Sequence, residues 1–197
     1  MTDASVITSK SKPDAAWGAV MSMALCVALL IASEFMPVSL LTPMAEGLDA
    51  SVGQTGQAVS ISGLFAVGAS LLITTVAGRL NRKWVLVGLT GLMLLSLIMV
   101  ALAQNFAVLM IGRALLGICI GGFWALATAV IMRLVPKGEV PRALSLMYGG
   151  QAIAAAFAAP LGSYLGDIIG WRGVFLALTP LVAINLIWHL VALPSLP

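Results

Sequence analysis

Charged residues are scarce in this chain, and their scarcity excludes a soluble fold. Of the 197 residues, ten are lysine or arginine and seven are aspartate or glutamate, whereas 61% are hydrophobic. A soluble domain of this size cannot bury that much apolar surface in its core. The composition therefore indicates an integral membrane protein.

Cysteine and histidine are rarer still, which argues against metal sites, disulfides and enzymatic chemistry. Cys26 and Cys119 both lie in apolar runs without metal-ligand spacing, so we expect them to pack and not to pair. An intramembrane enzyme needs a nucleophile with a base, paired aspartates, or metal ligands at one depth. The chain has one histidine and one carboxylate inside an apolar run, so we expect no enzyme, no metal and no cofactor.

The charged residues that are present divide the chain into six apolar runs, each close to the roughly 20 residues that cross about 30 Å of hydrocarbon. The runs are residues 17–41, 54–77, 84–103, 106–132, 144–165 and 173–193. We therefore expect an all-α membrane protein whose six transmembrane helices occupy residues 17–193. Residues 1–16 are predicted to form a cytoplasmic tail, and residues 194–197 the start of a cytoplasmic loop.

Lysine and arginine fall mainly on one side of the predicted bundle. Eight of them lie in the tail, between runs two and three, or between runs four and five: Lys10, Lys12, Arg79, Arg82, Lys83, Arg133, Lys137 and Arg142. By the positive-inside rule this side is cytoplasmic, and six spans return the carboxyl end to it. The cations behind the net charge of +3 thus serve to orient the chain in the membrane. They do not indicate a nucleic-acid partner, and we expect none.

Small residues at four-residue spacing predict where helices approach closely. Run five carries Gly150, Ala154, Ala158, Gly162 and Gly166, and run four carries Gly117, Gly121, Ala125 and Ala129. If the chain stands alone in the membrane, we expect the stripe on run five to face lipid. Runs three and six are richer in large aliphatic residues, so we expect them on the lipid side.

Glu34 lies inside run one. Placing an ionisable group there costs at least a few kcal/mol of free energy, and such groups usually have a function. At about 1.5 Å per residue, Glu34 lies about 18 Å before Glu46, and Arg113 about 12 Å after Asn105, both measured from the outer surface. The two opposite charges can pair if runs one and four are neighbours. Two alternatives stay open: a helix that ends near Pro37 and leaves Glu34 in the headgroups, and a purely structural ion pair.

Four motifs resemble the amino-terminal half of a major facilitator superfamily transporter, in the branch of twelve-span drug:proton antiporters. They are EFMPVSLLTPMA (34–45), IGRALLG (111–117) with GGFW (121–124), APLG (159–162) and GWRGVF (170–175). The resemblance covers residues 17–197. It implies half of a major facilitator bundle, made of two inverted three-helix repeats, in a bacterial inner membrane.

The same resemblance implies proton-coupled efflux of small planar solutes, with efflux pumps for purine ribonucleosides or related drugs as the nearest match. The chain would then need a missing carboxyl-terminal half, or self-association, as its partner. In this branch, Arg113 takes the place of an arginine implicated in proton transfer. Glu34 takes the place of an acidic residue implicated in proton or substrate coupling.

Further motif residues are expected to serve helix packing and gating. Gly117 and Gly121 belong to the run-four stripe, and Pro160 and Gly162 to the antiporter motif of run five, in which Ala159 and Ser163 replace the usual glycines. The transporters that this chain resembles also carry a motif in the loop between runs two and three. This chain matches only the cations of that motif. Those cations are Arg79, Arg82 and Lys83, whereas Gly78 stands where an aspartate is usual and Asn81 where a glycine is usual.

Aromatic and polar side chains of runs one, two, four and five are the predicted substrate contacts. Three could stack on a planar solute, and three could hydrogen-bond it. The first three are Phe35, Phe123 and Trp124, and the second are Gln57, Tyr148 and Gln151. Each has a structural alternative, because aromatic residues anchor helices at interfaces and glutamines near span ends are hydrated. Asn185 and His189 are interpreted as packing or snorkelling groups.

The predicted mechanism depends on two opposing influences on a buried carboxyl group. Dehydration favours the neutral acid, and a nearby cation favours the carboxylate. Glu34 beside Arg113 could therefore change protonation when hydration or a bound solute changes, and proton entry from outside would alternate with solute. Proton-coupled uptake and a non-transporting six-span scaffold or channel stay open as other functions.

Overall fold

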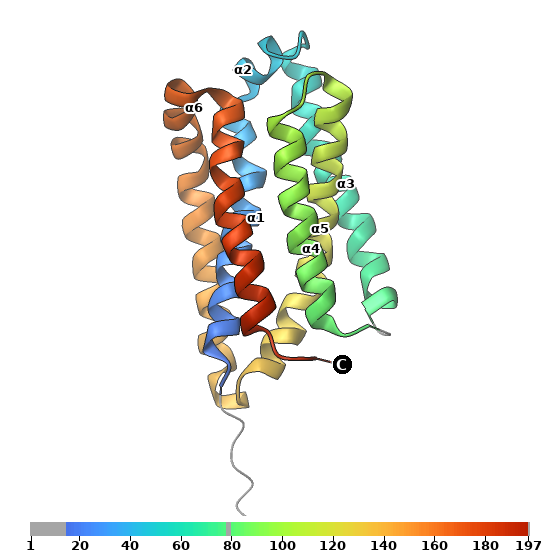
Figure 1. Cartoon of the computed structure of the whole chain (residues 1–197), viewed down its shortest axis with the longest axis vertical. Coiled ribbons are helices and arrows are strands. Elements are labelled where there is room, and N and C mark those ends of the chain that lie inside the picture. The colour runs from blue at the N-terminus through green and yellow to red at the C-terminus, as the bar shows by residue number, and fades with distance from the viewer. Residues whose placement is uncertain (1–14, 78–79, 197) are drawn as a thin grey trace, which may run out of the picture.

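The structure, a computed structural model, describes residues 15–77 and 80–196, and within them all regular structure is helical. The elements are α1 (Trp17–Ser39), α2 (Leu41–Glu46), α3 (Val52–Ala77), α4 (Arg82–Ala101), α5 (Phe106–Leu134), the short 3-10 helix η1 (Lys137–Glu139) and α6 (Val140–Ala192) (Figure 1). Five helices in these ranges are long and apolar enough to cross a membrane. The prediction of an all-helical membrane protein is confirmed.

The longest helix, α6, is a hairpin of two arms. Its 53 residues are interrupted at Gly170, whose φ of 72° and ψ of 161° are not helical. Glycine adopts this conformation without the strain that a Cβ atom would bring. Figure 1 shows the chain turning back there, so that residues 140–169 rise and residues 171–192 descend beside them. The two arms carry the fifth and sixth predicted runs.

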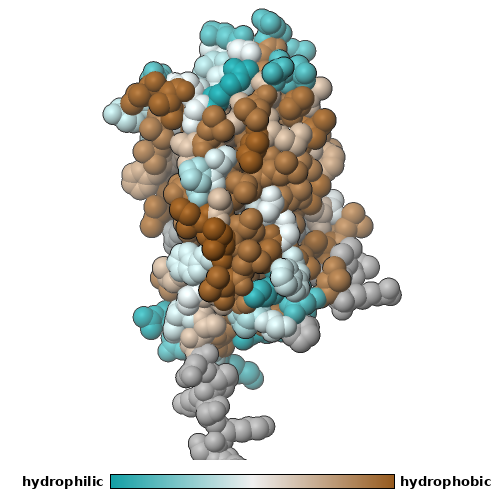
Figure 2. Space-filling model, viewed as in Figure 1, coloured by the Kyte–Doolittle hydropathy of each residue, from teal (hydrophilic) through white to brown (hydrophobic). Residues whose placement is uncertain are grey.

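The helices form a bundle, and on the face shown in Figure 2 hydrophilic residues gather at the two ends and hydrophobic residues lie between them. Packing is most extensive between α1 and α6, between α3 and α5, and between α4 and both α5 and α6. Met23, Met93, Leu116 and Phe175 are among the fully buried side chains that these contacts cover. The described helices therefore share one apolar core.

The two stripes of small residues lie at helix contacts, as their spacing predicts. A Cβ atom added at Gly117 would collide with the backbone of Ser62, and one at Gly121 with the backbone of Ala66, so α5 lies directly against α3. The run-five stripe packs on α1, where a Cβ atom at Gly150 would lie 3.2 Å from the Ala24 carbonyl oxygen. The prediction that this stripe faces lipid is therefore wrong, because α1 covers it.

The placement of run three on the lipid side is also wrong. Met93 and Leu97 of α4 are 0% and 1% exposed, whereas Leu64 and Leu71 of α3 are 67% and 71% exposed. Helix α4 lies between α5 and α6 and must turn one apolar face toward each. Side-chain size alone does not distinguish such a face from a lipid-facing one, because both are made of large aliphatic residues.

Candidate functional site

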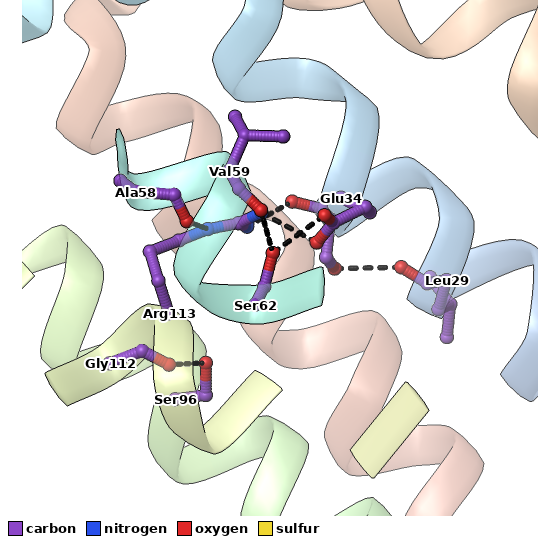
Figure 3. A network of polar contacts seen from close by, with 9 residues as sticks. Leu29, Glu34, Ala58, Val59, Ser62, Ser96, Gly112 and Arg113 are labelled. Atoms are coloured by element: carbon purple, nitrogen blue, oxygen red, sulfur yellow. Dashed lines mark hydrogen bonds and ion pairs between the residues drawn. The ribbon is translucent and has the colours of Figure 1, made fainter. Parts of the chain in front are cut away.

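Glu34 and Arg113 form an ion pair between α1 and α5 (Figure 3). Arg113 Nη2 lies 2.5 Å from Glu34 Oε2, and the side chains are 1% and 18% exposed for Arg113 and Glu34 respectively. Helix α1 ends at Ser39, two residues after Pro37, and Glu34 is paired with Arg113 and not free. The pair thus combines a fully buried cation with a partly exposed acid.

All three guanidinium nitrogens of Arg113 donate hydrogen bonds. Nε donates to the Ala58 carbonyl oxygen at 3.1 Å, Nη1 to the Ser33 carbonyl oxygen at 2.9 Å, and Nη2 to Glu34 and to the Ser62 hydroxyl. A buried cation is tolerated when its donors are satisfied in this way. Two of its acceptors are backbone atoms, so the anchoring of Arg113 does not depend on the charge of Glu34 alone.

Pro37 explains why the Ser33 carbonyl can accept from Arg113. In an α-helix that oxygen normally bonds the amide N–H four residues later, but proline has no N–H. Pro37 lies inside α1, so the helix continues while one acceptor is freed. A buried carbonyl needs a partner, and Arg113 supplies it.

Ser62 of α3 is the member of the site that the sequence did not indicate. Its Oγ lies 2.7 Å from Glu34 Oε1 and 2.7 Å from the Val59 carbonyl oxygen, and it accepts from Arg113 Nη2 at 3.2 Å (Figure 3). Serines in apolar helices commonly bond their own backbone, so this residue carries no recognisable motif. The close approach of α3 to Gly117 is what brings it to the ion pair.

The predicted substrate contacts are divided by the structure. Trp124 of α5 and Tyr148 of α6 stack with ring centroids 5.8 Å apart and an angle of 16° between the planes. Tyr148 is exposed, and Gln151 on the same helix is half-buried. Phe123 is 1% exposed and points into the core, so it does not share a surface with its neighbour Trp124.

Phe35 and Gln57 lie apart from the aromatic stack, beside the ion pair in sequence. Phe35 follows Glu34 on α1, and Gln57 precedes Ala58 on α3; both are exposed. Both are thus next in sequence to residues of the ion pair, whereas Trp124 contacts Tyr148. The six predicted contacts do not form one cluster.

A second buried polar cluster lies toward the other end of the bundle, where α1, α4 and α6 meet. His189 Nδ1 lies 3.0 Å from Thr90 Oγ1, which lies 3.7 Å from Cys26 Sγ. Among the residues that the structure describes, both polar side-chain atoms of Asn185 and His189 Nε2 have no hydrogen-bond partner. His189 and Asn185 are 0% exposed, so of the two predicted roles packing fits the structure and snorkelling does not.

Comparison with known sequence families agrees with this helical membrane architecture. The sequence model of the Major Facilitator Superfamily matches residues 23–197. The chain belongs to the Major Facilitator Superfamily. This superfamily is one of transporters and not of enzymes, which agrees with the prediction that the chain is not an enzyme.

Two similar curated superfamily relatives are bacterial. The chain is 52% identical over 198 residues to the transcription regulatory protein OpdE of Pseudomonas aeruginosa, covering 100% of this chain and 49% of OpdE. It is 48% identical over 181 residues to the purine ribonucleoside efflux pump NepI of Escherichia coli, covering 92% of this chain and 46% of NepI. The predicted resemblance to purine ribonucleoside efflux pumps is confirmed, and the chain spans about half the length of these relatives.

A solved structure supports the superfamily fold. The chain matches the crystal structure of a bacterial homolog of the human lysosomal transporter Spinster, in an inward-facing and unoccupied conformation. The TM-score is 0.76 at 17% identity, and the match covers 92% of this chain and 44% of that chain. At this identity the match shows the fold alone.

The superfamily motif residues outside the ion pair lie at helix contacts and at one end of the bundle. Gly162 is buried, with Ser39 Oγ 2.8 Å from the position of an added Cβ atom, and Pro160 is exposed on the same arm of α6. Arg82 and Lys83 begin α4, and the Arg82 amide donates to the Leu196 carbonyl oxygen at 2.9 Å. Arg79 lies outside the described residues.

Proposed function

We propose that the chain is the amino-terminal half of a transporter that exports small planar solutes, purine ribonucleosides or related compounds, in exchange for protons. The observation that carries this proposal is the ion pair of Glu34 and Arg113 inside membrane-spanning helices. Ionisable groups at such depth are costly and are typical of proton and ion pathways. The similarity to NepI supports purine ribonucleosides as the solute class.

The geometry supports Glu34 as the proton acceptor and Arg113 as a fixed cation. Glu34 is the more accessible of the two, so water can deliver a proton to its carboxylate. Protonation removes the charge that attracts Arg113, while the carbonyl oxygens of Ser33 and Ala58 keep the guanidinium in place. The Ser33 carbonyl would still join α1 to Arg113 of α5, so the contact between the two helices would be weaker but kept, and proton binding would make their relative movement easier.

The stacked pair of Trp124 and Tyr148 is the surface that best suits a planar solute. Two nearly parallel rings from different helices form an aromatic platform, and Gln151 lies close by on the helix that carries Tyr148. Phe35 and Gln57 remain proposed contacts nearer the acid. Phe123 would reach a solute only if α5 changed its packing, because its ring is buried.

We place the chain in the bacterial inner membrane with both ends cytoplasmic. The two arms of α6 would cross separately, giving six spans in two inverted three-helix repeats. Support comes from the end of the bundle where α1 begins and α6 ends, because α4, η1 and α6 also begin at that end (Figure 1). The starts of these elements carry Arg82, Lys83, Lys137 and Arg142. A second half, either the carboxyl-terminal half or another copy, would complete the solute path.

Vesicles that contain the chain, with and without a matching carboxyl-terminal half, test the proposed function. We expect purine-ribonucleoside-dependent proton flux with the second half present, and its loss in Glu34→Gln. Glu46→Gln is the matched control, because Glu46 is exposed at the end of α2. Intact coupled flux in Glu34→Gln would overturn the proton role of Glu34, and an opposite direction of proton movement would indicate uptake.

A regulatory role is the second candidate function, because OpdE, at 52% identity, is named as a transcription regulatory protein. A transporter homologue that binds a solute without moving it could act in this way. The same vesicles distinguish the two functions. Solute binding with no flux, in the presence of the second half, would favour regulation over transport.

A further inference from the structure

Ser62 has two acceptors for one hydrogen. Its Oγ lies 2.7 Å from Glu34 Oε1 and 2.7 Å from the Val59 carbonyl oxygen (Figure 3). A serine hydroxyl has one donor and two acceptor lone pairs, so it can bond only one of these oxygens fully at a time. The third contact, from Arg113 Nη2 at 3.2 Å, occupies one lone pair.

We propose that Ser62 is a positioning residue that lets Glu34 gain and lose a proton without displacing Arg113. This inference rests on the proposed function, in which Glu34 carries the proton. When Glu34 is a carboxylate, the Ser62 hydroxyl donates to Oε1 and accepts from Arg113. When a proton binds Oε1, the new acid O–H donates to Ser62 Oγ, and the Ser62 hydrogen turns to the Val59 carbonyl.

The hydrogen bonds balance in both states. The arriving proton forms one new O–H bond on Glu34, and the Ser62 hydrogen only rotates about its Cβ–Oγ bond. The cluster of Glu34 and Arg113 changes from net charge zero to +1. In the protonated state Ser62 donates one bond and accepts two, which uses its full capacity. Every member of the cluster therefore has a partner before and after protonation.

The surroundings of Ser62 favour rotation of the hydroxyl over movement of the backbone. Ser62 is 0% exposed, and its backbone lies against Gly117, where even a Cβ atom would collide. Arg113 is held by the Ala58 and Ser33 carbonyl oxygens as well. The hydroxyl hydrogen is thus the part of the site that can move at the least cost.

Infrared difference spectroscopy of the chain in lipid bilayers, as a function of pH, tests this role. The carbonyl stretching band that is missing in Glu34→Gln reports protonated Glu34. In Ser62→Ala we expect this band to move to the higher wavenumber of a less hydrogen-bonded acid. We also expect Glu34 to bind its proton about fivefold more tightly in this variant. The hydrogen bond from Ser62 to the ionised carboxylate is stronger than the bond to the neutral acid, so its removal destabilises the ionised form more.

Two variants make the comparison specific. Ser62→Thr keeps the hydroxyl and is expected to retain the parent band and proton affinity. Ser33→Ala removes a buried hydroxyl that donates to the Leu29 carbonyl oxygen of its own helix at 2.7 Å, so it is the matched control and should also behave like the parent. Should Ser62→Ala fail to insert, Ser62→Cys, with a weaker donor, should shift the band and the affinity in the same direction by less.

The inference is overturned if Ser62→Ala keeps the parent band and affinity, if Ser33→Ala shifts them equally, or if no Glu34 band exists at any pH at which the chain stays folded. Its failure is separate from that of the proposed function. An unchanged spectrum in Ser62→Ala together with lost flux in Glu34→Gln removes only the role of Ser62. A shifted spectrum together with intact flux in Glu34→Gln removes the transport role and leaves the hydroxyl arrangement.

Discussion

The two buried polar clusters of the bundle differ in how completely their atoms are bonded. Around Arg113 every guanidinium nitrogen donates, to two backbone carbonyls, a carboxylate and a hydroxyl. Around His189 one contact joins Thr90, and within the described chain Asn185 has both polar side-chain atoms unpaired. In the charged cluster every guanidinium nitrogen has a hydrogen-bond partner, whereas in the neutral cluster several described polar atoms have none.

The difference follows from the cost of an unsatisfied group. A buried charge without partners costs far more than a buried amide or imidazole without partners, so only the charged site requires a full set of acceptors. Bonding on every side also fixes the distance between α1, α3 and α5, which the site joins. The contacts of α6 with α1 and α4 depend mainly on apolar packing, which is extensive between these helices.

Removing the cation should produce the largest effect. Arg113→Ala leaves Glu34 without its partner and the Ser33 carbonyl without its donor, so we expect a loss of about 3–5 kcal/mol in the free energy of unfolding. Equilibrium unfolding in lipid and detergent mixtures measures it. The double variant Glu34→Leu with Arg113→Met should recover most of the loss, and a cost below about 1 kcal/mol for Arg113→Ala would contradict the importance of the pair.

The neutral cluster should respond in the opposite direction when its unpaired amide is removed. Asn185→Leu replaces an unsatisfied buried group by an apolar one of similar size, and we expect a gain of about 1–3 kcal/mol in the same unfolding measurement. Asn185→Asp, which keeps the shape and adds a charge, is the control and should lose stability. A loss of stability in Asn185→Leu would mean that the amide has a partner in the membrane.

The smallest effect is expected at the one side-chain bond to His189. Thr90→Val keeps the shape but removes the hydroxyl at 3.0 Å from His189 Nδ1, which should cost about 1 kcal/mol of unfolding free energy. Thr90→Ser retains the hydroxyl and should cost less. Equal losses in the two variants would show that the methyl group of Thr90, and not its hydroxyl, is what stabilises this contact.

The sequence predicted the helices and the similar depths of Glu34 and Arg113 from spacing, whereas their pairing depended on runs one and four being neighbours, which spacing does not decide. Apolar runs between charges predicted the helical segments, and the rise per residue brought Glu34 and Arg113 to similar depths. Spacing also predicted the close helix contact at Gly117 and Gly121, because residues four apart lie on the same face of a helix.

What the sequence did not reveal depends on contacts between helices. Ser62 bonds Glu34 only because α3 meets α5 at Gly117, and no local pattern marks such a serine. Asn185 and His189 lie near a span end, where hydropathy cannot tell an inward face from an outward one. The buried face of α4 was misplaced for a similar reason, since apolar side chains pack against protein and lipid alike.

Pro37 has a consequence for which positions near the site tolerate change. The acceptor that holds Arg113 on α1 is a main-chain oxygen, and it is available because the imino acid one turn later brings no competing hydrogen. Replacing the side chain at position 33 leaves that oxygen where it is. Any other residue at position 37 introduces a rival donor, so the electrostatic anchor of the first helix is encoded one turn away from the atom that provides it.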